Sequence, residues 1–300
     1  MNNKFEFSSK FNTANIFSLL VFIISIAFIF FKGLNYGIDF KGGTLIELRT
    51  VNTDASSIRS LLGSMDLGDV NVKKFGNDGD YLIKVEQKDS DDNKIIPQIK
   101  KNLSDNLNTE INFRRIENVG PKVSSELLQS GIIAISLSLA AMLFYIWIRF
   151  EWQFSVGSIV AIFHDVVITL GIFSVLSLEI NLSIIAAVLT IVGYSMNDTV
   201  VIYDRIRENL NKYNRLNISE IANLSINDTL ARTIITSVTT LLALLSIFIL
   251  GGEILRGFSF AMILGVIIGT YSSIFVASPI LKFFKVTYKT LEKEEEKIVP

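Results

Sequence analysis

A carboxylate inside an apolar stretch is the feature of this sequence with the clearest chemical potential. The segment VGYSMNDTVVIYDRIREN (192–209) contains Asp198, which is the single charged residue between positions 180 and 203. A helix that ended at Gly193 would be too short for the ~20 residues that a membrane span requires, so the apolar residues after Asp198 also belong near the membrane. An ionised carboxylate there costs several kcal/mol unless it is paired, hydrated or protonated. The sequence therefore predicts a functional role for Asp198, with a purely structural hydrogen bond between helices as the alternative.

Four polar residues share the predicted helix with Asp198. Tyr194 precedes Asp198 by four positions, Ser195 precedes Thr199 by four, and Asn197 is adjacent. Residues four apart lie on one side of a helix, where Ser, Asn and Thr can hydrogen-bond to a neighbouring helix. We expect these residues either to orient the carboxylate or to serve as packing contacts.

Arg232 is a candidate partner for Asp198 because it stands at the entrance of the next apolar stretch along the chain. An arginine side chain keeps its charge and could compensate a buried carboxylate. Two purely structural roles for Arg232 are also open. A basic residue at this end of a span is typical of cytoplasmic loops, and Asp228 lies four residues earlier, where it could form a local helical ion pair.

His164 and Asp165 lie near the centre of another apolar stretch, in IFHDVVIT. Histidine titrates near neutral pH, so the pair could form part of a proton path. The alternative is structural: the histidine would donate a hydrogen bond between helices, and Asp165 would hold its ring.

Composition excludes several other kinds of chemistry. The chain has no cysteine and one histidine, which excludes disulfides, thiolate nucleophiles and multi-histidine metal sites. The 28 basic and 29 acidic residues create no overall field that would attract nucleic acid. Residues 38–44 (IDFKGGT) lack the spacing of a phosphate-binding loop, and we expect their glycines to form a turn. We therefore predict neither an enzyme nor a bound cofactor or metal.

Six apolar stretches predict a polytopic α-helical membrane protein. The chain is 50% hydrophobic and only 19% charged, against ~25% charged residues in typical soluble domains. Lys and Arg gather in the short loops of one side, and only Arg256 lies in those of the other, so both termini are expected in the cytoplasm. The predicted spans are 11–31, 127–148, 152–178, 180–203, 233–252 and 257–281.

The one sizeable polar segment, residues 32–126, predicts a small α+β domain outside the membrane. Its pattern is strand, helix, strand, strand, helix, strand (βαββαβ), the order of a ferredoxin-like fold. Thr53 is the expected N-cap of the first helix, Pro97 should interrupt the second, and residues 77–79 should form a turn. The predicted organisation is thus a cytoplasmic N-terminus and first span (1–31), a periplasmic domain (32–126), five further spans (127–281) and a cytoplasmic tail (282–300). Short amphipathic cytoplasmic helices are expected near 204–232.

Four segments together resemble the SecF family, the smaller membrane component of bacterial SecD–SecF accessory translocases. They occur in the same order at plausible intervals and cover nearly the whole chain. The segments are FKGLNYGIDFKGGTLIELR (31–49), FHDVVITLG (163–171), VGYSMNDTVVIYDRIREN (192–209) and LARTIITSVTTLLALLSIFILGG (230–252).

The resemblance implies a function that the residues alone do not. Members of this family resemble half of a resistance-nodulation-division transporter. They pair with SecD beside the SecYEG channel of the inner membrane, and they use the proton motive force to promote late steps of preprotein export. The ATPase SecA and a YajC-type accessory subunit would be indirect partners, and unfolded preprotein the substrate. The family's essential fourth-span acid and fifth-span arginine correspond to Asp198 and Arg232. The resemblance assigns no role to His164.

Two other functions are compatible with the residues. A proton-coupled exporter half for a lipid or small molecule would need a large ligand-accepting outer domain, and residues 32–126 are few for that purpose. A passive scaffold for neighbouring translocon subunits would not need Asp198 to titrate.

Overall fold

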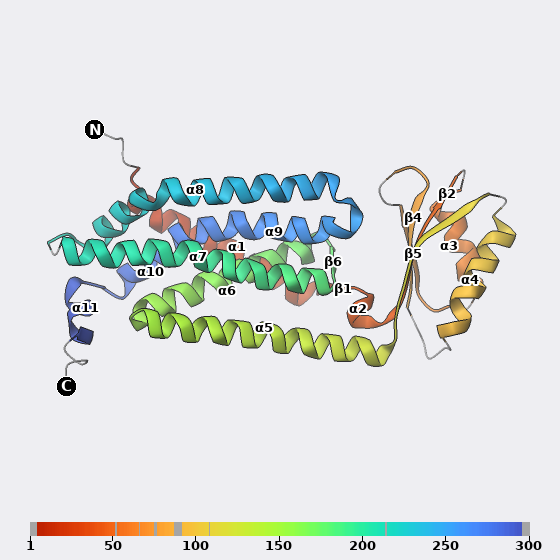
Figure 1. Ribbon diagram of the computed structural model, residues 1–300, viewed down its shortest axis with the longest axis horizontal. Helices are drawn as coiled ribbons and strands as arrows, with labels where there is room; N and C mark the ends of the chain where they lie inside the picture. The colour runs from red at the N-terminus through yellow and green to blue at the C-terminus, as the bar shows by residue number, and fades with distance from the viewer. Residues whose placement is uncertain are drawn as a thin grey trace. The chain divides into compact units, whose positions relative to one another are not determined.

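The computed structural model describes residues 5–51, 53–65, 67–74, 77–86, 92–107, 109–213 and 215–295 (Figure 1). The chain forms two compact units. The first comprises residues up to Leu34, Ile135–Leu178 and Ser183 onwards, and the second comprises Asn35–Ala134 and Glu179–Leu182.

Six helices of the described chain are long and apolar enough to cross a membrane, which confirms the six predicted spans. The sixth begins as α9, passes through a π-helical turn at Ser273–Ala277 and continues as α10. The helices are α1 (Phe11–Phe31), α5 (Pro121–Arg149), α6 (Trp152–Val175), α7 (Leu182–Lys212), α8 (Ile218–Leu250), α9 (Gly252–Ser272) and α10 (Ser278–Phe283). A 3-10 turn, Ser8–Lys10, precedes α1, and α11 (Tyr288–Glu295) follows α10.

The expected short amphipathic helices near 204–232 are wrong. Instead, α7 continues to Lys212, and α8 begins at Ile218 behind a capping box formed by Asn217 and Glu220. The reason is that the polar stretch keeps an apolar face of helical spacing, whose residues, such as Ile206 and Ile221, are buried. The two spans therefore extend as regular helices beyond their most apolar parts.

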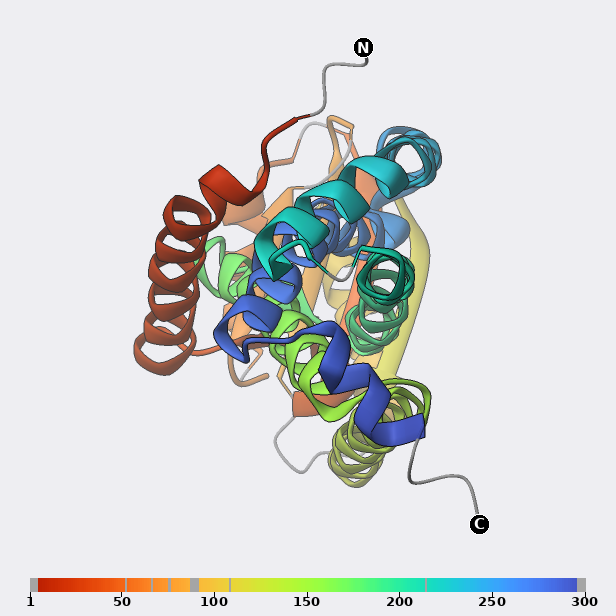
Figure 2. The same ribbon diagram turned by 90° about the vertical axis from the view of Figure 1, so that its left-hand side faces the viewer.

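The inner helices of the first unit are α6, α7 and the sixth span, whereas the apolar stretches of α1, α5 and α8 are mostly exposed. Figure 2 shows α1, in red, at the periphery of this group of helices. Small residues allow the closest approaches. A Cβ atom added to Gly171 on α6 would lie 2.8 Å from the Cα of Ser25 on α1. The packing thus depends on Gly and Ser, as is usual between helices in lipid.

The π-helical turn leaves carbonyl groups that side chains satisfy. The Tyr203 hydroxyl donates to the carbonyl of Ala277 at 2.9 Å, and the Ser278 hydroxyl donates to that of Ser273 at 2.9 Å. Because lipid offers no hydrogen bonds, such partners make the irregular turn tolerable.

The second unit contains a four-stranded antiparallel sheet with strand order β3-β4-β2-β5. Buried side chains of the sheet and of two helices, among them Ile46, Ile83, Ile58 and Leu103, form one core. In chain order the elements are β2 (Gly43–Thr50), α3 (Ala55–Gly63), β3 (Val70–Lys74), β4 (Asp80–Val85), α4 (Asp92–Asn106) and β5 (Ile111–Val119).

Two local expectations for this unit are corrected. The N-cap of α3 is Asp54 rather than Thr53, because the Asp54 carboxylate accepts the backbone N–H of Ser57. Pro97 lies within α4 and does not interrupt it. Pro97 is the sixth residue of α4, so it removes one hydrogen bond, to the carbonyl of residue 93, and the helix continues past it.

A second, two-stranded parallel sheet pairs β1 (Asn35–Tyr36) with β6 (Glu179–Ile180). The short helix α2 (Ile38–Lys41) follows β1. Gly42 and Gly43 then turn the chain into β2 with φ angles of 78° and 127°, which favour glycine. These glycines form the expected turn.

Candidate functional site

Asp198 lies on α7 and is buried, with 3% of its surface exposed. Its Oδ2 atom is buried and has no hydrogen-bond partner among the described residues. Met196 and Ile202, one turn or less away on the same helix, belong to the apolar core. An unsatisfied carboxylate oxygen in such surroundings is costly when ionised, and its protonation would remove much of that cost.

Arg232, on α8, is exposed, and no ion pair joins it to Asp198 in the described part of the chain. Its positive charge nevertheless acts on the Asp198 carboxylate through space. The alternative of a local ion pair between Asp228 and Arg232 is wrong: Asp228 accepts two hydrogen bonds from Arg205 of α7, at 2.8 and 3.0 Å. The guanidinium of Arg232 is therefore not held by the nearest acid on its own helix.

The polar residues predicted to lie near Asp198 do not form one group around its carboxylate. Asn197 is exposed, on a different face of α7 from the buried Asp198. The Thr199 hydroxyl donates to the carbonyl of Ser195 at 3.1 Å, within the same helix. Tyr194 donates to the hydroxyl of Ser237 on α8 at 3.3 Å. None of these hydrogen bonds involves the Asp198 carboxylate. These residues can therefore orient it only indirectly, by fixing the position of α7.

Asp165 on α6 is the centre of a buried hydrogen-bond network. The Ser195 hydroxyl of α7 donates to its Oδ2 at 2.5 Å, and the Ser272 hydroxyl of α9 donates to the same atom at 2.7 Å. The Nδ1 atom of His164 lies 2.9 Å from Oδ1. One carboxylate thus ties three helices together, and one of the contacts lies a single turn before Asp198.

His164 has one satisfied and one unsatisfied ring nitrogen. Nε2 is buried and has no hydrogen-bond partner among the described residues. The ring stacks on Phe22 of α1, with centroids 6.3 Å apart and an interplanar angle of 6°. A carboxylate beside Nδ1 favours the tautomer that carries its proton there, which leaves Nε2 as a hydrogen-bond acceptor. The contact shows how Asp165 holds the ring, and a role of the pair in a proton path stays a prediction.

Sequence patterns did not reveal the hydroxyl residues on the partner helices. Ser272 completes the Asp165 site, and Ser237 connects Tyr194 to Thr270 of α9 at 2.8 Å. Thr233, also on α8, has a buried hydroxyl without a partner in the described residues. The sequence indicates these residues only as serines and threonines within uncharged spans. Their spacing does not identify the helix that each of them faces.

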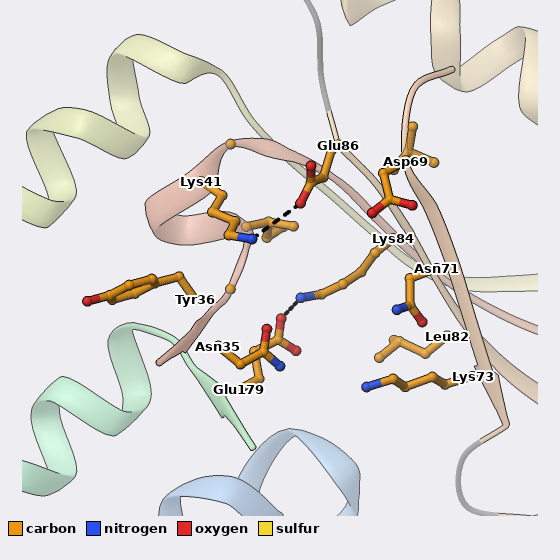
Figure 3. Close-up of a pocket in the computed structure, with 14 residues that line it drawn as sticks. Asn35, Tyr36, Lys41, Asp69, Asn71, Lys73, Leu82, Lys84, Glu86 and Glu179 are labelled. Carbon is orange, nitrogen blue, oxygen red and sulfur yellow. Dashed lines mark hydrogen bonds and ion pairs between the residues drawn. The ribbon is translucent and has the colours of Figure 1, made fainter. Parts of the chain in front are cut away.

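A separate pocket of about 180 Å³ lies in the second unit, between β1, β6 and the open face of the sheet (Figure 3). Burial, followed by the charges of Lys73 and Lys41, lowers the pKa of Lys84 to about 8. Lys84 nevertheless forms an ion pair with Glu179. Three lysines and three carboxylates line this pocket, so it offers no net charge to a ligand and chiefly connects β6 to the sheet.

Comparison with known proteins gives consistent matches over most of the chain. The family described as "Protein export membrane protein SecD/SecF, C-terminal" matches residues 99–287, and the "SecD/SecF GG Motif" matches residues 27–54. The chain is 47% identical to "Protein translocase subunit SecF" of Rickettsia bellii over 283 residues, 93% of each chain. It is 45% identical to the protein of the same description from Rickettsia rickettsii over 295 residues, 96% of each chain.

Two solved structures are also similar. A crystal structure of SecDF, described as a translocon-associated membrane protein, from Thermus thermophilus matches with a TM-score of 0.86 and 36% identity over 95% of this chain. A SecDF structure described as a super-membrane-facing form matches with a TM-score of 0.70 and 35% identity over 99% of this chain. This chain spans only 39% and 40% of the length of those two SecDF chains.

Proposed function

Because the chain belongs to the SecF family of protein translocase subunits, we propose that it acts with SecD to drive late steps of protein export by the proton motive force. The observation that carries the proposal is Asp198, a buried carboxylate on an apolar helix with an oxygen that has no hydrogen-bond partner among the described residues. One proton that crosses a potential of ~100 mV releases ~2.3 kcal/mol. A group that takes up and releases this proton within the span can couple that energy to a conformational change.

In the proposed cycle, the charge of Asp198 determines how strongly α7 and α8 attract each other. Ionised Asp198 attracts Arg232, whose charge acts on it through space. Neutral Asp198 loses most of this attraction, so protonation favours a different arrangement of the two helices. Asp165 and His164 provide either a path for the proton or the fixed contacts against which α7 moves.

The proposed topology places both termini in the cytoplasm, residues 32–126 in the periplasm and the six spans in the bacterial inner membrane. The distribution of Lys and Arg among the short loops supports this orientation. The element order of the second unit and its strand order β3-β4-β2-β5 support a ferredoxin-like fold for the periplasmic domain. We propose domain limits of 1–31, 32–126, 127–281 and 282–300.

The proposed partners follow from the family. SecD would supply the second half of a twelve-span unit, which agrees with the SecDF chains being more than twice as long as this one. SecYEG would be the neighbouring channel, SecA and a YajC-type subunit indirect partners, and unfolded preprotein the substrate that the domain 32–126 contacts. The proposed role is transport, without an enzymatic reaction or a cofactor.

The test is preprotein export in vesicles that contain this protein together with SecD. Asp198→Asn keeps the size of the side chain but cannot ionise. We expect this variant to lose the part of export that an uncoupler abolishes in the wild type. Assembly with SecD must be equal in both samples, as measured by co-purification.

Asp204→Asn is the matched control, because Asp204 lies on the same helix and forms an exposed ion pair with Arg149 at 3.0 Å. Such a pair is worth ~0–1 kcal/mol, so export should keep its uncoupler sensitivity. If Asp198→Asn also keeps it, the proton-coupling proposal fails and a passive scaffold is favoured. Proton-driven efflux of a lipid or small molecule without any effect on preprotein would favour the exporter.

A further inference from the structure

A second pocket, of about 270 Å³, lies at the end of the helices where α7 leads into α8 and where α10 leads into α11. Figure 1 shows both junctions at the same end of the first unit. Leu210, Ile218 and Val286 supply apolar walls, and Tyr213 and Tyr288 lie beside them. The proton-coupling residues described above take no part in this pocket.

The charged residues that line the pocket are Lys282 and Lys285, and no acidic side chain is among the lining residues that the structure describes. Neither lysine forms an ion pair in the described part of the chain. Glu220, two residues after Ile218 on α8, is engaged in the capping box with Asn217. The pocket therefore presents two positive charges above an apolar floor, which complements an anion that carries apolar groups.

The backbone at Lys285 is unusual for its residue type. Its φ angle is 50°, in the left-handed region, and Val286 and Lys285 donate backbone hydrogen bonds to the carbonyls of Leu281 and Lys282, both at 3.1 Å. This is a Schellman ending of α10, in which the left-handed position usually belongs to glycine. A lysine here gives up local stability, which indicates that its side chain is needed at this position.

Aromatic side chains place the pocket at the edge of the hydrocarbon. Phe283, next to Lys282, is 82% exposed at the end of the sixth span. Trp152 is also exposed and contacts Phe284, with ring centroids 5.0 Å apart. Exposed aromatic residues at the ends of spans are typical of the boundary between acyl chains and headgroups.

We infer that this pocket binds the headgroup phosphate of an anionic phospholipid, with Lys282 and Lys285 at the phosphate and the apolar floor against the glycerol and first acyl carbons. A free phosphate would leave that floor without contacts. Basic residues at a membrane surface attract anionic lipids generally, whereas a pocket fixes one headgroup in place. The inference rests on the membrane-spanning helices and is independent of proton coupling.

Lipid titration of the purified full chain in detergent tests this inference. Phosphatidylglycerol, phosphatidylcholine and inorganic phosphate would each be added, and binding measured by native mass spectrometry and by the shift in thermal unfolding. We expect binding of phosphatidylglycerol only. The Lys282→Gln/Lys285→Gln double variant should bind it about tenfold more weakly or worse, and Lys282→Arg/Lys285→Arg should retain most of the affinity.

Lys10→Gln/Lys289→Gln is the matched control, because both lysines are exposed and neither lines the pocket. It removes the same charge and should leave the affinity for phosphatidylglycerol within about twofold. An equal loss in this control would overturn the inference in favour of diffuse attraction. Binding of inorganic phosphate as tight as that of the lipid would overturn it in favour of a simple anion site.

Lys285→Gly separates binding from folding. Glycine suits the left-handed position, so this variant should unfold at a higher temperature than the wild type in the absence of lipid. It should nevertheless bind phosphatidylglycerol more weakly. A variant that is more stable and binds as well as the wild type would show that the lysine does not hold the lipid.

Discussion

The Ser195 hydroxyl and the Asp165 carboxylate lie 2.5 Å apart, and this hydrogen bond joins α6 to the turn of α7 that precedes Asp198. Ser272 of α9 donates to the same carboxylate oxygen at 2.7 Å. The helix that carries the proposed proton-coupling group is thus held directly against α6 at this turn, and α9 binds the same carboxylate. In the proposed cycle, α7 would move relative to this contact when Asp198 changes its charge.

The first prediction concerns Asp165. Replacement by leucine leaves His164, Ser195 and Ser272 without their acceptor in a buried site, so we expect the free energy of unfolding to fall by about 1–3 kcal/mol. Proton-driven export should fall as well, although Asp198 is intact. Thermal unfolding in detergent and export in vesicles measure the two effects.

Single replacement of a donor is the control for Asp165. Ser272→Ala removes one hydrogen bond between helices, which is worth ~0.6 kcal/mol on average in membrane proteins. The Asp165→Leu variant should therefore be clearly less stable than Ser272→Ala. Equal stability of the two variants would mean that the carboxylate does not act as the centre of the network.

The second prediction concerns the coupling between Asp198 and Arg232. If the two charges act as one unit, Arg232→Gln should abolish uncoupler-sensitive export, and the double variant with Asp198→Asn should be no worse than either single variant. Arg232→Lys, which keeps the charge, should retain part of the activity. If Arg232→Gln keeps its full uncoupler sensitivity in the vesicle assay, Asp198 acts without Arg232.

Much of the fold follows from hydrophobic patterning. Stretches of ~20 apolar residues leave few alternatives to membrane spans. The strand and helix order predicted for residues 32–126 agrees with that of β2 to β5 and the helices between them. The ends of α7 and α8 could not be predicted in the same way, because an amphipathic segment can either continue a helix or start a new one. Asp54 and Thr53 are both residue types that favour the N-cap position, so the sequence alone could not show which of them caps α3.

The site was only partly predictable, for a different reason. Asp198 stands out because a carboxylate is conspicuous among apolar residues. Ser195 and Ser272 do not stand out, because their importance comes from Asp165, which lies on another helix. The sequence of one chain shows which residues share a face of each helix. It does not show how the helices are rotated or shifted along their axes relative to one another.

The third prediction tests the closest contact between α1 and α6. In Gly171→Ala, the added methyl group would lie within 2.8 Å of the Cα of Ser25, so the two helices must separate. We expect the free energy of unfolding to fall by about 1–3 kcal/mol. Gly193→Ala on α7 is the control, because its new methyl group would meet only the end of Met142, at 3.8 Å. Thermal unfolding in detergent should distinguish the two variants, and equal midpoints would contradict a close contact between α1 and α6.

The fourth prediction concerns the pH dependence of the α3 N-cap. Hydrogen bonds from Ser56 and Ser57 lower the pKa of Asp54 from 3.8 to about 2. A carboxyl whose pKa is lowered by folding stabilises the folded state above its unfolded pKa, and this contribution is lost as the pH falls from about 4 to about 2. Amide hydrogen exchange within α3 should therefore show a loss of protection over this range in the wild type.

Two variants isolate this effect from general acid unfolding. In Asp54→Asn the cap is retained but cannot titrate, so the change in α3 protection between pH 4 and pH 2 should disappear while other helices behave as in the wild type. Ser56→Ala removes the largest cause of the lowered pKa, the hydroxyl that donates to Asp54 at 2.6 Å. The loss of protection should then be smaller and should be complete at a higher pH, because the folded pKa lies closer to the unfolded one. If Ser56→Ala leaves the midpoint unchanged, the Ser56 hydroxyl does not stabilise the ionised cap.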